Sequence, residues 1–504
     1  MTNDRYRILV VSNISGMGKG GVPVFNQHLT EALARHHDVT LFTADPDTVA
    51  HQGARMVSTP HPPEGVDARD WITQQAGVDP RAHGLPDPQD RPFDMIIGHS
   101  RFSGPAATEI RDRWYPDARV AHFLHTSPER LPGFKYPDDP ERAQAKAARD
   151  SSIEREVMGR ADVVVGVGPL LTTEAERLSA AGRHVPDAHQ LIPGVKVEEL
   201  VRRGQHEGRL NLLVMGRTDD PLKGVDDALR AVKKLNAAGV DVHLTVRGAD
   251  PEKLDRITKA ASRLGGEGNV TVKPFTKDAN ELKNDIIGAD AVIMPSKHEG
   301  FGLVATEAAG HGVPVLVNQD SGAAQFLSDP SRIDPKIGLP CVVPEPDNPK
   351  HRPAAWGKAM QELKADLPQR RENAKELREA LKAYSWDHAS QGLVEATMKS
   401  TPLPQKGQDG PAAQQQAQQR VTSVQGPNGT LLTSGEPKQR AAPAAVGPQS
   451  ALARAANLTS PGARPAAAQA NAPGAGRQGP GPAAAARRFQ PPPTQPGPGR
   501  SPGR

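Results

Sequence analysis

Along the first 200 residues, short aliphatic runs alternate with longer segments that have the pattern of helices. The short runs are bounded by Gly, Pro and Asp, which is typical of buried strands. Strands are predicted at 7–12, 38–43, 94–97, 119–123 and 162–167, and the first helix at 22–36. Segments 45–92 and 126–150 are rich in loop-forming residues, and we expect at most a short helix in the first of them.

The same pattern starts again near residue 211. Strands are predicted at 211–215, 241–246, 269–273, 289–294 and 313–317, with helices at 224–238, 251–264 and 278–287. Strands that alternate with helices indicate a parallel sheet covered by helices on both faces. We therefore predict an α/β protein with two Rossmann-like, doubly wound domains that face a cleft, where ligands would bind beyond the carboxyl ends of the strands.

The composition divides the chain into four segments. We predict an N-terminal Rossmann-like domain at 1–195, a C-terminal one at 196–383, a closing helix at 384–400 and a tail at 401–504. The tail consists mainly of Pro, Ala, Gln and Gly, so it cannot bury enough apolar surface to offset its ordering entropy and is predicted to be disordered. It could be a passive extension, a tether or a binder of acidic partners.

The net charge of +4 is unevenly distributed. Residues 401–504 contain eleven Lys and Arg and two acidic residues, which leaves the preceding 400 residues at −5. The part predicted to fold is therefore mildly acidic, and nucleic acid is not an expected partner.

Cysteine usage and hydropathy point to the cytoplasm. Cys341 is the only cysteine, so neither an intrachain disulfide nor a Cys-based zinc site can form. The first residues lack the apolar core of a signal peptide, and no run of 18 apolar residues predicts a membrane span. Peripheral contact with a membrane stays open.

A loop at 296–302 joins the predicted strand at 289–294 to a helix that begins near Leu303. The unpaired N–H groups at such a helix start form an anion site that would suit a diphosphate. Glu299 lies in the loop and Glu307 about one turn into the helix. A carboxylate can accept hydrogen bonds from a sugar diol, although carboxylates are also common near helix starts for their favourable interaction with the helix dipole.

Two cations follow the first strand of the second half. Arg217 lies just beyond the strand, and Lys223 lies at the start of the next helix. Together they could neutralise a leaving diphosphate without a metal ion, whereas either one alone could be a solvated surface charge.

The N-terminal glycines support a different interpretation. Gly16, Gly18 and Gly21 fit the G-x-G-x-x-G pattern, and Asp45 lies where a dinucleotide-binding protein would hold ribose. An NAD-dependent oxidoreductase is therefore a rival hypothesis. A P-loop is excluded, because Lys19 is followed by Gly rather than by Ser or Thr.

Histidines end two strands of the first half. His99 follows the strand at 94–97, and His122 and His125 lie at the end of the next one, so each could be structural or face the cleft. Asp45 and Asp47 match a metal-binding Asp-x-Asp string, but such short matches are common. We predict no metal site.

The motif of the second half resembles that of a known family. The run P-S-x-x-E-G-F-G-L-x-x-x-E-A-x-x-x-G-x-P-V at 295–315 resembles the donor-site signature of the retaining GT-B glycosyltransferases of family 4, also called glycosyl transferases group 1. Arg217 and Lys223 resemble the phosphate clamp of that family, Gly-Gly-Val at 20–22 its glycine-rich loop, and Ser-Trp at 385–386 its terminal helix, which packs back on the first domain.

The resemblance implies roles for individual residues. Glu307 would bind the nucleotide ribose, Glu299 would lie against the donor sugar, and His125 would contact that sugar near the reacting centre. Apart from the resemblance, His99 lies at another strand end that is expected to face the same cleft, where it could touch the acceptor or have a hydrogen-bonded structural role. The other expected substrate-binding positions, which would act mainly through the backbone, are Gly20, Gly21, Phe301, Gly302 and Leu303.

The resemblance also implies a reaction. A sugar, expected to be a hexose, would pass from a nucleotide-diphosphate sugar to a hydroxyl of a small-molecule, glycan or lipid acceptor. Transfer would retain the anomeric configuration by a front-side path without metal or cofactor. A phosphorylase, an epimerase and a non-catalytic sugar-nucleotide-binding protein stay open as hypotheses. One departure is that segment 321–325 lacks the glutamate that the family commonly has there.

Overall fold

The computed structural model describes residues 5–16, 19–180, 182, 184–198, 200 and 208–402. All of them lie in the first of two compact units, Met1–Thr459. The tail predicted at 401–504 lies outside the described residues, apart from residues 401 and 402.

Seven parallel strands form the first sheet, in the order β3-β2-β1-β4-β5-β6-β7. The strands are β1 Arg7–Ser12, β2 Asp38–Thr43, β3 Arg55–Ser58, β4 Met95–His99, β5 Arg119–Leu124, β6 Val163–Val167 and β7 Asp187–Leu191. The strand order changes direction between β1 and β4, which is the switch point of a doubly wound sheet. The sequence pattern missed β3 and β7 because both are edge strands whose residues are mostly exposed or half-buried.

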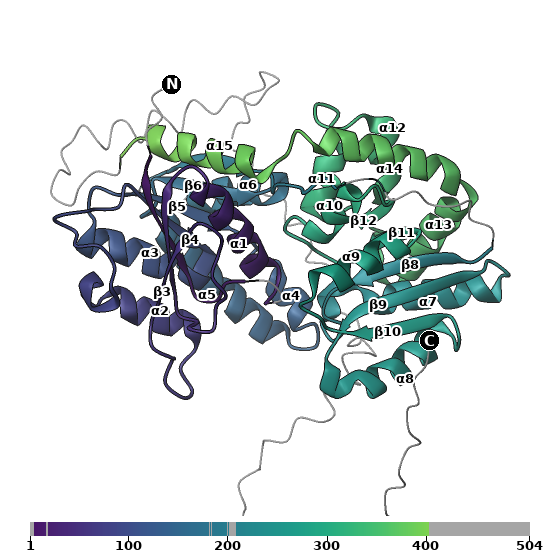
Figure 1. Cartoon of the computed structure of the whole chain (residues 1–504). Helices are drawn as coiled ribbons and strands as arrows, with labels where there is room; N and C mark the ends of the chain where they lie inside the picture. Colours follow the sequence, from purple (N-terminus) through teal and green to yellow (C-terminus); the bar gives the residue numbers. More distant parts are fainter. Residues whose placement is uncertain are drawn as a thin grey trace, which may run out of the picture. The chain divides into compact units, whose positions relative to one another are not determined.

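Helices cover both faces of this sheet (Figure 1). They are α1 Gly21–Ala34, α2 Ala68–Ala76, α3 Ser100–Trp114, α4 Leu131–Lys135, α5 Pro140–Met158 and α6 Pro169–Ser179, with a short 3-10 turn, η1, at Pro80–His83. The prediction of loops over 126–150 was therefore wrong, because α4 and the start of α5 lie there. The buried positions of α5 are mostly small or polar, such as Ala143, Ser151 and Glu154, so the helix has no apolar period in the sequence.

Alternation along β1 explains how both faces are buried. Ile8 and Val10 belong to a core cluster that includes Leu29 of α1, whereas Leu9 and Val11 belong to a second cluster with residues of α2 and α3. A strand that is buried on both faces is expected to be a continuous apolar run, which is what made β1 predictable.

The second sheet has six strands, in the order β10-β9-β8-β11-β12-β13. The strands are β8 Leu210–Met215, β9 Val242–Ala249, β10 Val270–Pro274, β11 Ala291–Met294, β12 Val315–Asn318 and β13 Val342–Val343. The order repeats that of the first sheet, with its switch point between β8 and β11.

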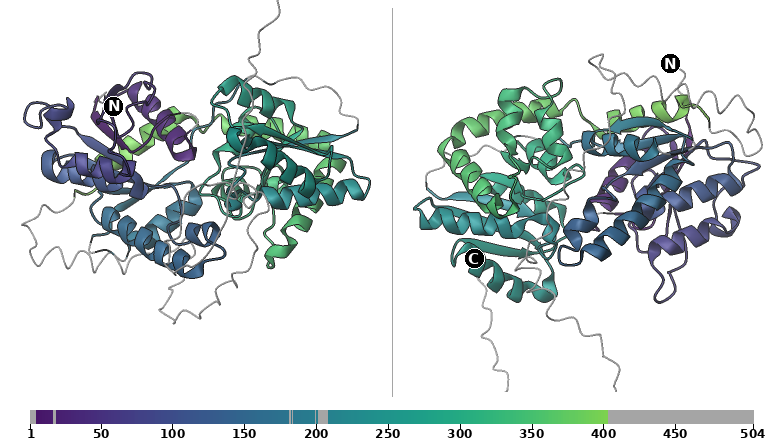
Figure 2. Two further views of the ribbon diagram at one scale, coloured as in Figure 1. Left: turned by 90° about the horizontal axis from the view of Figure 1, so that it is seen from below. Right: turned by 180° about the vertical axis from the view of Figure 1, so that it is seen from behind.

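Helices also flank the second sheet, as the two further views in Figure 2 show. They are α7 Val225–Ala237, α8 Leu254–Gly265, α9 Ala279–Gly288, α10 Leu303–Gly310, α11 Gly322–Ser328, α12 Pro335–Gly338, α13 Arg352–Ala365 and α14 Leu367–Leu381. The 3-10 turns are η2 Pro221–Lys223, η3 Pro251–Lys253, η4 Leu339–Cys341 and η5 Pro349–His351. Trp356 of α13 is buried in the cluster that also contains Leu229 and Val232 of α7.

The last helix, α15 Trp386–Lys399, packs against α1 (Figure 1). The ring of Trp386 lies 5.1 Å from that of Phe25 and is stacked on His28 at 5.4 Å, measured between centroids. Gly194, which follows β7, lets that segment pass close to the start of α15, because a Cβ there would overlap the backbone and ring of Trp386.

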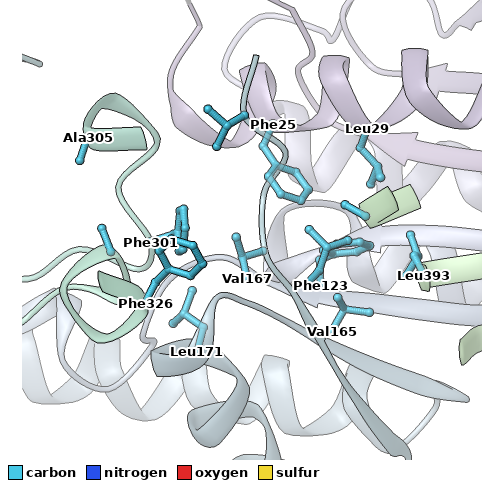
Figure 3. Packing of buried hydrophobic residues seen from close by; sticks show 14 of the residues in the cluster. Phe25, Leu29, Phe123, Val165, Val167, Leu171, Phe301, Ala305, Phe326 and Leu393 are labelled. Atoms are coloured by element: carbon cyan, nitrogen blue, oxygen red, sulfur yellow. The ribbon is translucent and has the colours of Figure 1, made fainter. Parts of the chain in front are cut away.

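Phe301 belongs to a core cluster that contains residues of both sheets, such as Val167 of β6 and Val317 of β12. Its side chain is 4% exposed and lies 6.1 Å from the ring of Phe326, and Figure 3 shows both beside Leu171 and Val167. Gly168 leaves room for this ring, because a Cβ at that glycine would overlap it.

Among the described residues, none of the helices is both long and apolar enough to cross a membrane.

Candidate active site

The loop after β11 and the turn after β8 bring two of the expected residues together. Lys223 Nζ donates a hydrogen bond to Glu299 Oε2 at 2.7 Å. The two side chains are 24% and 23% exposed, so the ion pair lies in a partly open position. Both residues follow strands next to the switch point, where ligands of doubly wound sheets bind.

The loop after β12 supports the backbone of Glu299 on both sides. Glu299 N donates to Asp320 O at 3.2 Å, and Gly322 N donates to Glu299 O at 3.1 Å. A side chain at position 322 would overlap the carbonyl of Gly300. Segment 321–325, which lacks the expected glutamate, thus contacts the loop at 296–302, the expected donor loop, through its backbone.

Gly224 lets the turn after β8 approach the donor loop. Its φ is +64°, and a Cβ there would overlap the carbonyl oxygen of Pro295. A left-handed conformation costs a non-glycine residue about 1–2 kcal/mol.

We expect Gly224→Ala to destabilise the protein by more than this conformational cost, because Pro295 must also move. Thermal unfolding and donor binding would measure the effect. Gly239→Ala is the matched control, since Gly239 has a φ of +79° and no atom within 4 Å of the added Cβ. Equal effects of the two substitutions would contradict a steric role for Gly224.

Glu307 is exposed on α10 and yet desolvated. Its side chain is accessible, but the protein around it raises the pKa of its carboxyl group. An accessible carboxylate that is poorly hydrated would gain from the hydrogen-bond donors of a ligand.

Several helices near the switch points begin at glycine rather than at a capping side chain. α1, α7 and α10 start after Gly20, Gly224 and Gly302, and none of these starts has a side-chain cap hydrogen bond. By contrast, α2, α5, α9, α11 and α15 start after Asp or Ser caps. Glycine leaves the first N–H groups of a helix available to an anion.

Arg217 pairs with a different carboxylate from Lys223. Its guanidinium donates to Asp220 Oδ2 at 2.7 Å, and its side chain is 70% exposed. Phe301 contributes its side chain to the core, so only its backbone is placed to meet a ligand. Leu303, the first residue of α10, is half-buried.

The N-terminal glycine loop is only partly described, since residues 17 and 18 lie outside the described ranges. Gly20 has a φ of +112°, and neither Gly20 nor Gly21 would meet an atom closer than 4.0 Å if it carried a Cβ. Lys19 forms an ion pair with Asp45, which also accepts a hydrogen bond from Thr48 at 2.9 Å. These contacts occupy the carboxylate that the dinucleotide interpretation reserves for ribose.

His99 and His125 lie in contact at the ends of β4 and β5. His99 Nδ1 lies 3.0 Å from His125 Nε2, and His99 Nε2 lies 2.8 Å from Asn26 Oδ1. His99 is 1% exposed, and both its ring nitrogens are engaged. The expectation that His99 touches substrate is therefore not supported, because the side chain has neither access nor a free ring nitrogen.

His125 adjoins the donor loop. A Cβ on Gly300 would lie 2.5 Å from His125 O, so that glycine allows the two segments to touch. Burial holds the pKa of His125 well below its usual value, and the neighbouring His99 and His122 lower it further. His125 is therefore neutral at physiological pH.

Ser100 holds His125 in place, although no pattern in the sequence pointed to it. Ser100 is the one non-glycine residue with positive φ, +43°, among the described residues. Its hydroxyl donates to Phe123 O at 3.2 Å and accepts from His125 N at 3.0 Å. Strained backbone of this kind often marks functional sites.

A second contact near the donor loop was also not predicted. Arg130, in the segment after β5, donates two hydrogen bonds to Asp320, one of them at 2.9 Å. Nearby, the ring of Phe134 is stacked on buried His298 at 6.0 Å. This contact ties segment 130–134 to the loop that supports Glu299.

Within the described part of the chain, no group of three or more His, Cys, Asp or Glu side chains is placed to hold a metal ion. The side chain of Asp45 is instead paired with Lys19.

The chain is similar to known proteins over most of its described length. Residues 9–393 match the model of a family described as "Family 4 Glycosyltransferase in conflict systems". Among curated proteins, D-inositol 3-phosphate glycosyltransferase of Xylanimonas cellulosilytica is 28% identical over 417 residues, which cover 76% of this chain and 92% of that protein. The enzyme of that name from Mycobacterium sp. (strain JLS) is 30% identical over 334 residues, covering 62% and 72%.

A solved structure supports the same fold. Sucrose-phosphate synthase from Thermosynechococcus elongatus has a TM-score of 0.58 and 20% identity, with 78% of this chain and 98% of that chain covered. The two sheets with their matching strand orders are thus the two domains of the GT-B fold. The chain belongs to the family 4 glycosyltransferases of conflict systems and is a glycosyltransferase of the GT-B fold.

Proposed function

We propose that this glycosyltransferase moves a hexose from a nucleotide-diphosphate sugar to an acceptor hydroxyl with retention of the anomeric configuration. The observation that carries this proposal is the Lys223–Glu299 ion pair beside the uncapped start of α10. A cation, a carboxylate and free helix N–H groups within one small region suit a diphosphate and the sugar attached to it.

The reaction we infer is a front-side displacement. The bond from the anomeric carbon to the diphosphate oxygen breaks, and the acceptor oxygen forms its bond on the same face. The acceptor proton passes to the departing diphosphate. Lys223, Arg217 and the first amides of α10 offset the negative charge of that diphosphate, so the chain's own groups supply what a metal ion would otherwise provide.

Glu299 would position the sugar and stabilise its developing positive charge. Its carboxylate accepts a hydrogen bond from Lys223 before donor arrives, which orients it. When the diphosphate binds, Lys223 can turn to it and leave Glu299 facing the sugar.

Glu307 would accept hydrogen bonds from the ribose hydroxyls. Desolvation raises the pKa of this carboxyl, so the ionised form lacks part of the hydration it would have in water. Two hydroxyl donors from a ribose would replace that hydration.

An anionic acceptor fits the surroundings of Lys135. Lys135 is an exposed residue at the end of α4. Partial desolvation lowers its pKa, Asp220 raises it, and Arg217, Arg101 and Lys146 lower it further. Four cationic side chains therefore lie around this position, although Arg217 is paired with Asp220, and both Arg101 and Lys146 with Asp150. The relatives named D-inositol 3-phosphate glycosyltransferase have a phosphorylated compound in their name, and we propose a phosphorylated acceptor here as well.

We propose a cytoplasmic setting for this reaction. The single cysteine, Cys341, has its thiol pKa raised to about 11 by burial, so it is poorly reactive and offers no disulfide that would require an oxidising compartment.

A thermal-shift screen tests the donor assignment. We expect one of UDP-, GDP- or ADP-glucose to stabilise the protein by about 2.7 kcal/mol at 100 times its dissociation constant, and NAD(H) to have no effect. Stabilisation by NAD(H) alone would support the oxidoreductase instead.

Product analysis with the stabilising donor separates a transferase from an epimerase, a phosphorylase and a non-catalytic protein. Incubation with inositol phosphates, glucose 6-phosphate and neutral sugars should release the nucleoside diphosphate and give an α-linked product from an α-linked donor, as seen in the anomeric proton NMR signal. Donor turnover without acceptor to an isomeric nucleotide sugar would indicate an epimerase, and phosphate-dependent cleavage of the product a phosphorylase. Binding without any turnover would indicate a non-catalytic protein.

A further inference from the structure

A chain of buried polar side chains runs from His125 to the segment after β2. His125 Nε2 lies 3.0 Å from His99 Nδ1, His99 Nε2 lies 2.8 Å from Asn26 Oδ1, and Asn26 Nδ2 donates to Ser15 Oγ at 3.0 Å. The hydroxyl of Ser15 lies 3.2 Å from His51 Nε2. All five side chains are less than 9% exposed. Such a network is more than packing, because each member restricts where its neighbour carries a proton.

The orientation of the Asn26 amide determines which groups of this network donate hydrogen bonds and which accept them. Its Oδ1 faces His99 and also accepts from Thr30 Oγ1 at 3.5 Å, whereas its amide nitrogen faces Ser15. An amide oxygen can only accept, so His99 carries its proton on Nε2. In a neutral imidazole the other nitrogen is then an acceptor, and His125 must donate from Nε2 to His99 Nδ1. His125 Nδ1 is consequently left with a lone pair.

The surroundings keep both imidazoles neutral. Burial lowers the pKa of His99 to about 3 and holds that of His125 well below its usual range. His122 of β5 lowers both pKa values, and its Nε2 lies 2.9 Å from Glu154 Oε2 of α5. Arg101 of α3 lies against the same glutamate.

At the other end of this network, the charged groups around His51 shift its pKa in opposite directions. Burial lowers the pKa of His51, with Glu31 raising it and His28 lowering it. None of these groups places a full negative charge on the His99–His125 pair, so no partner favours an imidazolium there.

We propose that Asn26 is a positioning residue: through His99 it holds His125 in the tautomer whose Nδ1 accepts a hydrogen bond from a hydroxyl of the donor sugar. The role of His125 at the sugar rests on the proposed function, whereas the tautomer itself does not. Ser100 and the contact with Gly300 fix the backbone of His125, and Phe25 and Phe123 pack against its ring. Asn26 is therefore expected to determine the protonation pattern rather than the position of the ring.

The direction of donation has a chemical consequence. A neutral imidazole nitrogen with a lone pair binds a hydroxyl, which can donate, but repels a carboxylate, which can only accept. The site would therefore select a donor sugar with a hydroxyl at this position over the corresponding uronic acid.

The tautomer can be measured on the full-length protein without substrate. Long-range ¹H–¹⁵N correlation spectra of ¹⁵N-histidine-labelled protein distinguish protonated from bare ring nitrogens, and His99→Gln and His125→Gln variants assign the signals. We expect both histidines to be neutral with the proton on Nε2 throughout pH 5.5–8. A proton on Nδ1 of His125, or an imidazolium signal from either ring, would overturn the proposal whatever the enzyme's activity.

Asn26→Asp tests the role of the amide. The carboxylate still accepts from His99 Nε2, but its negative charge raises the pKa of His99. Once protonated, His99 donates from Nδ1 to His125 Nε2, so His125 must carry its proton on Nδ1 and loses its acceptor site. Turnover of the donor identified by thermal shift should then fall at least tenfold at low pH and recover as the pH rises through the new His99 pKa.

The matched control is Asn236→Asp in the second domain, where the amide bonds only to backbone groups of Val232 and Val242. It should leave the pH profile of donor turnover unchanged. If Asn26→Asp merely lowers stability and turnover falls equally at every pH, the proposal fails. If the donor has no turnover at all in the wild-type protein, the proposed function fails while the tautomer remains open to the spectra.

Discussion

Replacing Lys223 by methionine is expected to lower the rate of donor turnover by about 10²–10³ and to leave stability almost unchanged. Removing one preorganised group that meets developing charge typically costs this much in kcat. The Lys223–Glu299 pair is about a quarter exposed, and pairs of this kind contribute about 0–1 kcal/mol to folding. Release of the nucleoside diphosphate and thermal unfolding would measure the two quantities separately.

Lys234 provides the control for this substitution. It lies exposed on α7, the helix that follows the turn carrying Lys223. Lys234→Met should leave turnover at the wild-type level. Glu299→Gln should lower turnover strongly as well, because an amide cannot stabilise the positive charge that develops on the sugar. Wild-type turnover in both the Lys223 and Glu299 variants would remove the basis for the assigned site.

The fold was predictable where burial makes a strand uniformly apolar. β1, β5 and β6 are central strands with helices on both faces, and their Val, Ile and Leu runs are visible in the sequence. β7 escaped prediction because most of its residues are exposed or half-buried. α5 escaped because its buried face contains Asp150, Ser151 and Glu154, whose polar side chains break the apolar pattern that prediction depends on.

Residues of the candidate site can be picked out in the sequence where the chemistry requires a motif with fixed local spacing. Glu299, Gly302 and Glu307 lie within one loop and the helix it enters, so their arrangement follows from the sequence alone. Lys223 meets Glu299 only because β8 and β11 are neighbours in the sheet. The spacing between Lys223 and Glu299 could not predict this contact. The family resemblance suggested it, because the two motifs follow one another in the order typical of the family.

Contacts between distant, individually unremarkable residues could not be predicted. Asn26 and Ser15 look like ordinary polar residues of a helix and a loop, and only the fold brings them into line with His99. The same holds for Arg130 and Asp320, which are 190 residues apart in the chain. No short sequence pattern predicts contacts between residues so far apart in the chain.

Removal of Glu154 should cause a large loss of stability. Its side chain is fully buried, Oε1 accepts from Arg101 N at 2.9 Å, and Oε2 lies 2.9 Å from His122 Nε2. Arg101 and Asp150, whose side chains are 6% and 5% exposed, complete the cluster. Deleting one partner of a buried ionic group costs about 3–5 kcal/mol, because the others stay buried without compensation. Glu154→Ala should therefore lower the free energy of unfolding by about this amount in a denaturant titration.

Two further variants separate charge from packing at this position. Glu154→Gln keeps the shape and can still accept from the backbone of Arg101, so its loss should be smaller, about 1–3 kcal/mol, the cost of imperfect pairing in a buried cluster. Glu395→Ala, which removes an exposed glutamate paired with Lys399 on α15, should leave the unfolding midpoint unchanged. Equal stability of Glu154→Ala and Glu395→Ala would contradict this prediction. It would mean that Asp150 alone satisfies Arg101. Glu154 would then matter for its contact with His122, which lowers the pKa values of His99 and His125, rather than for stability.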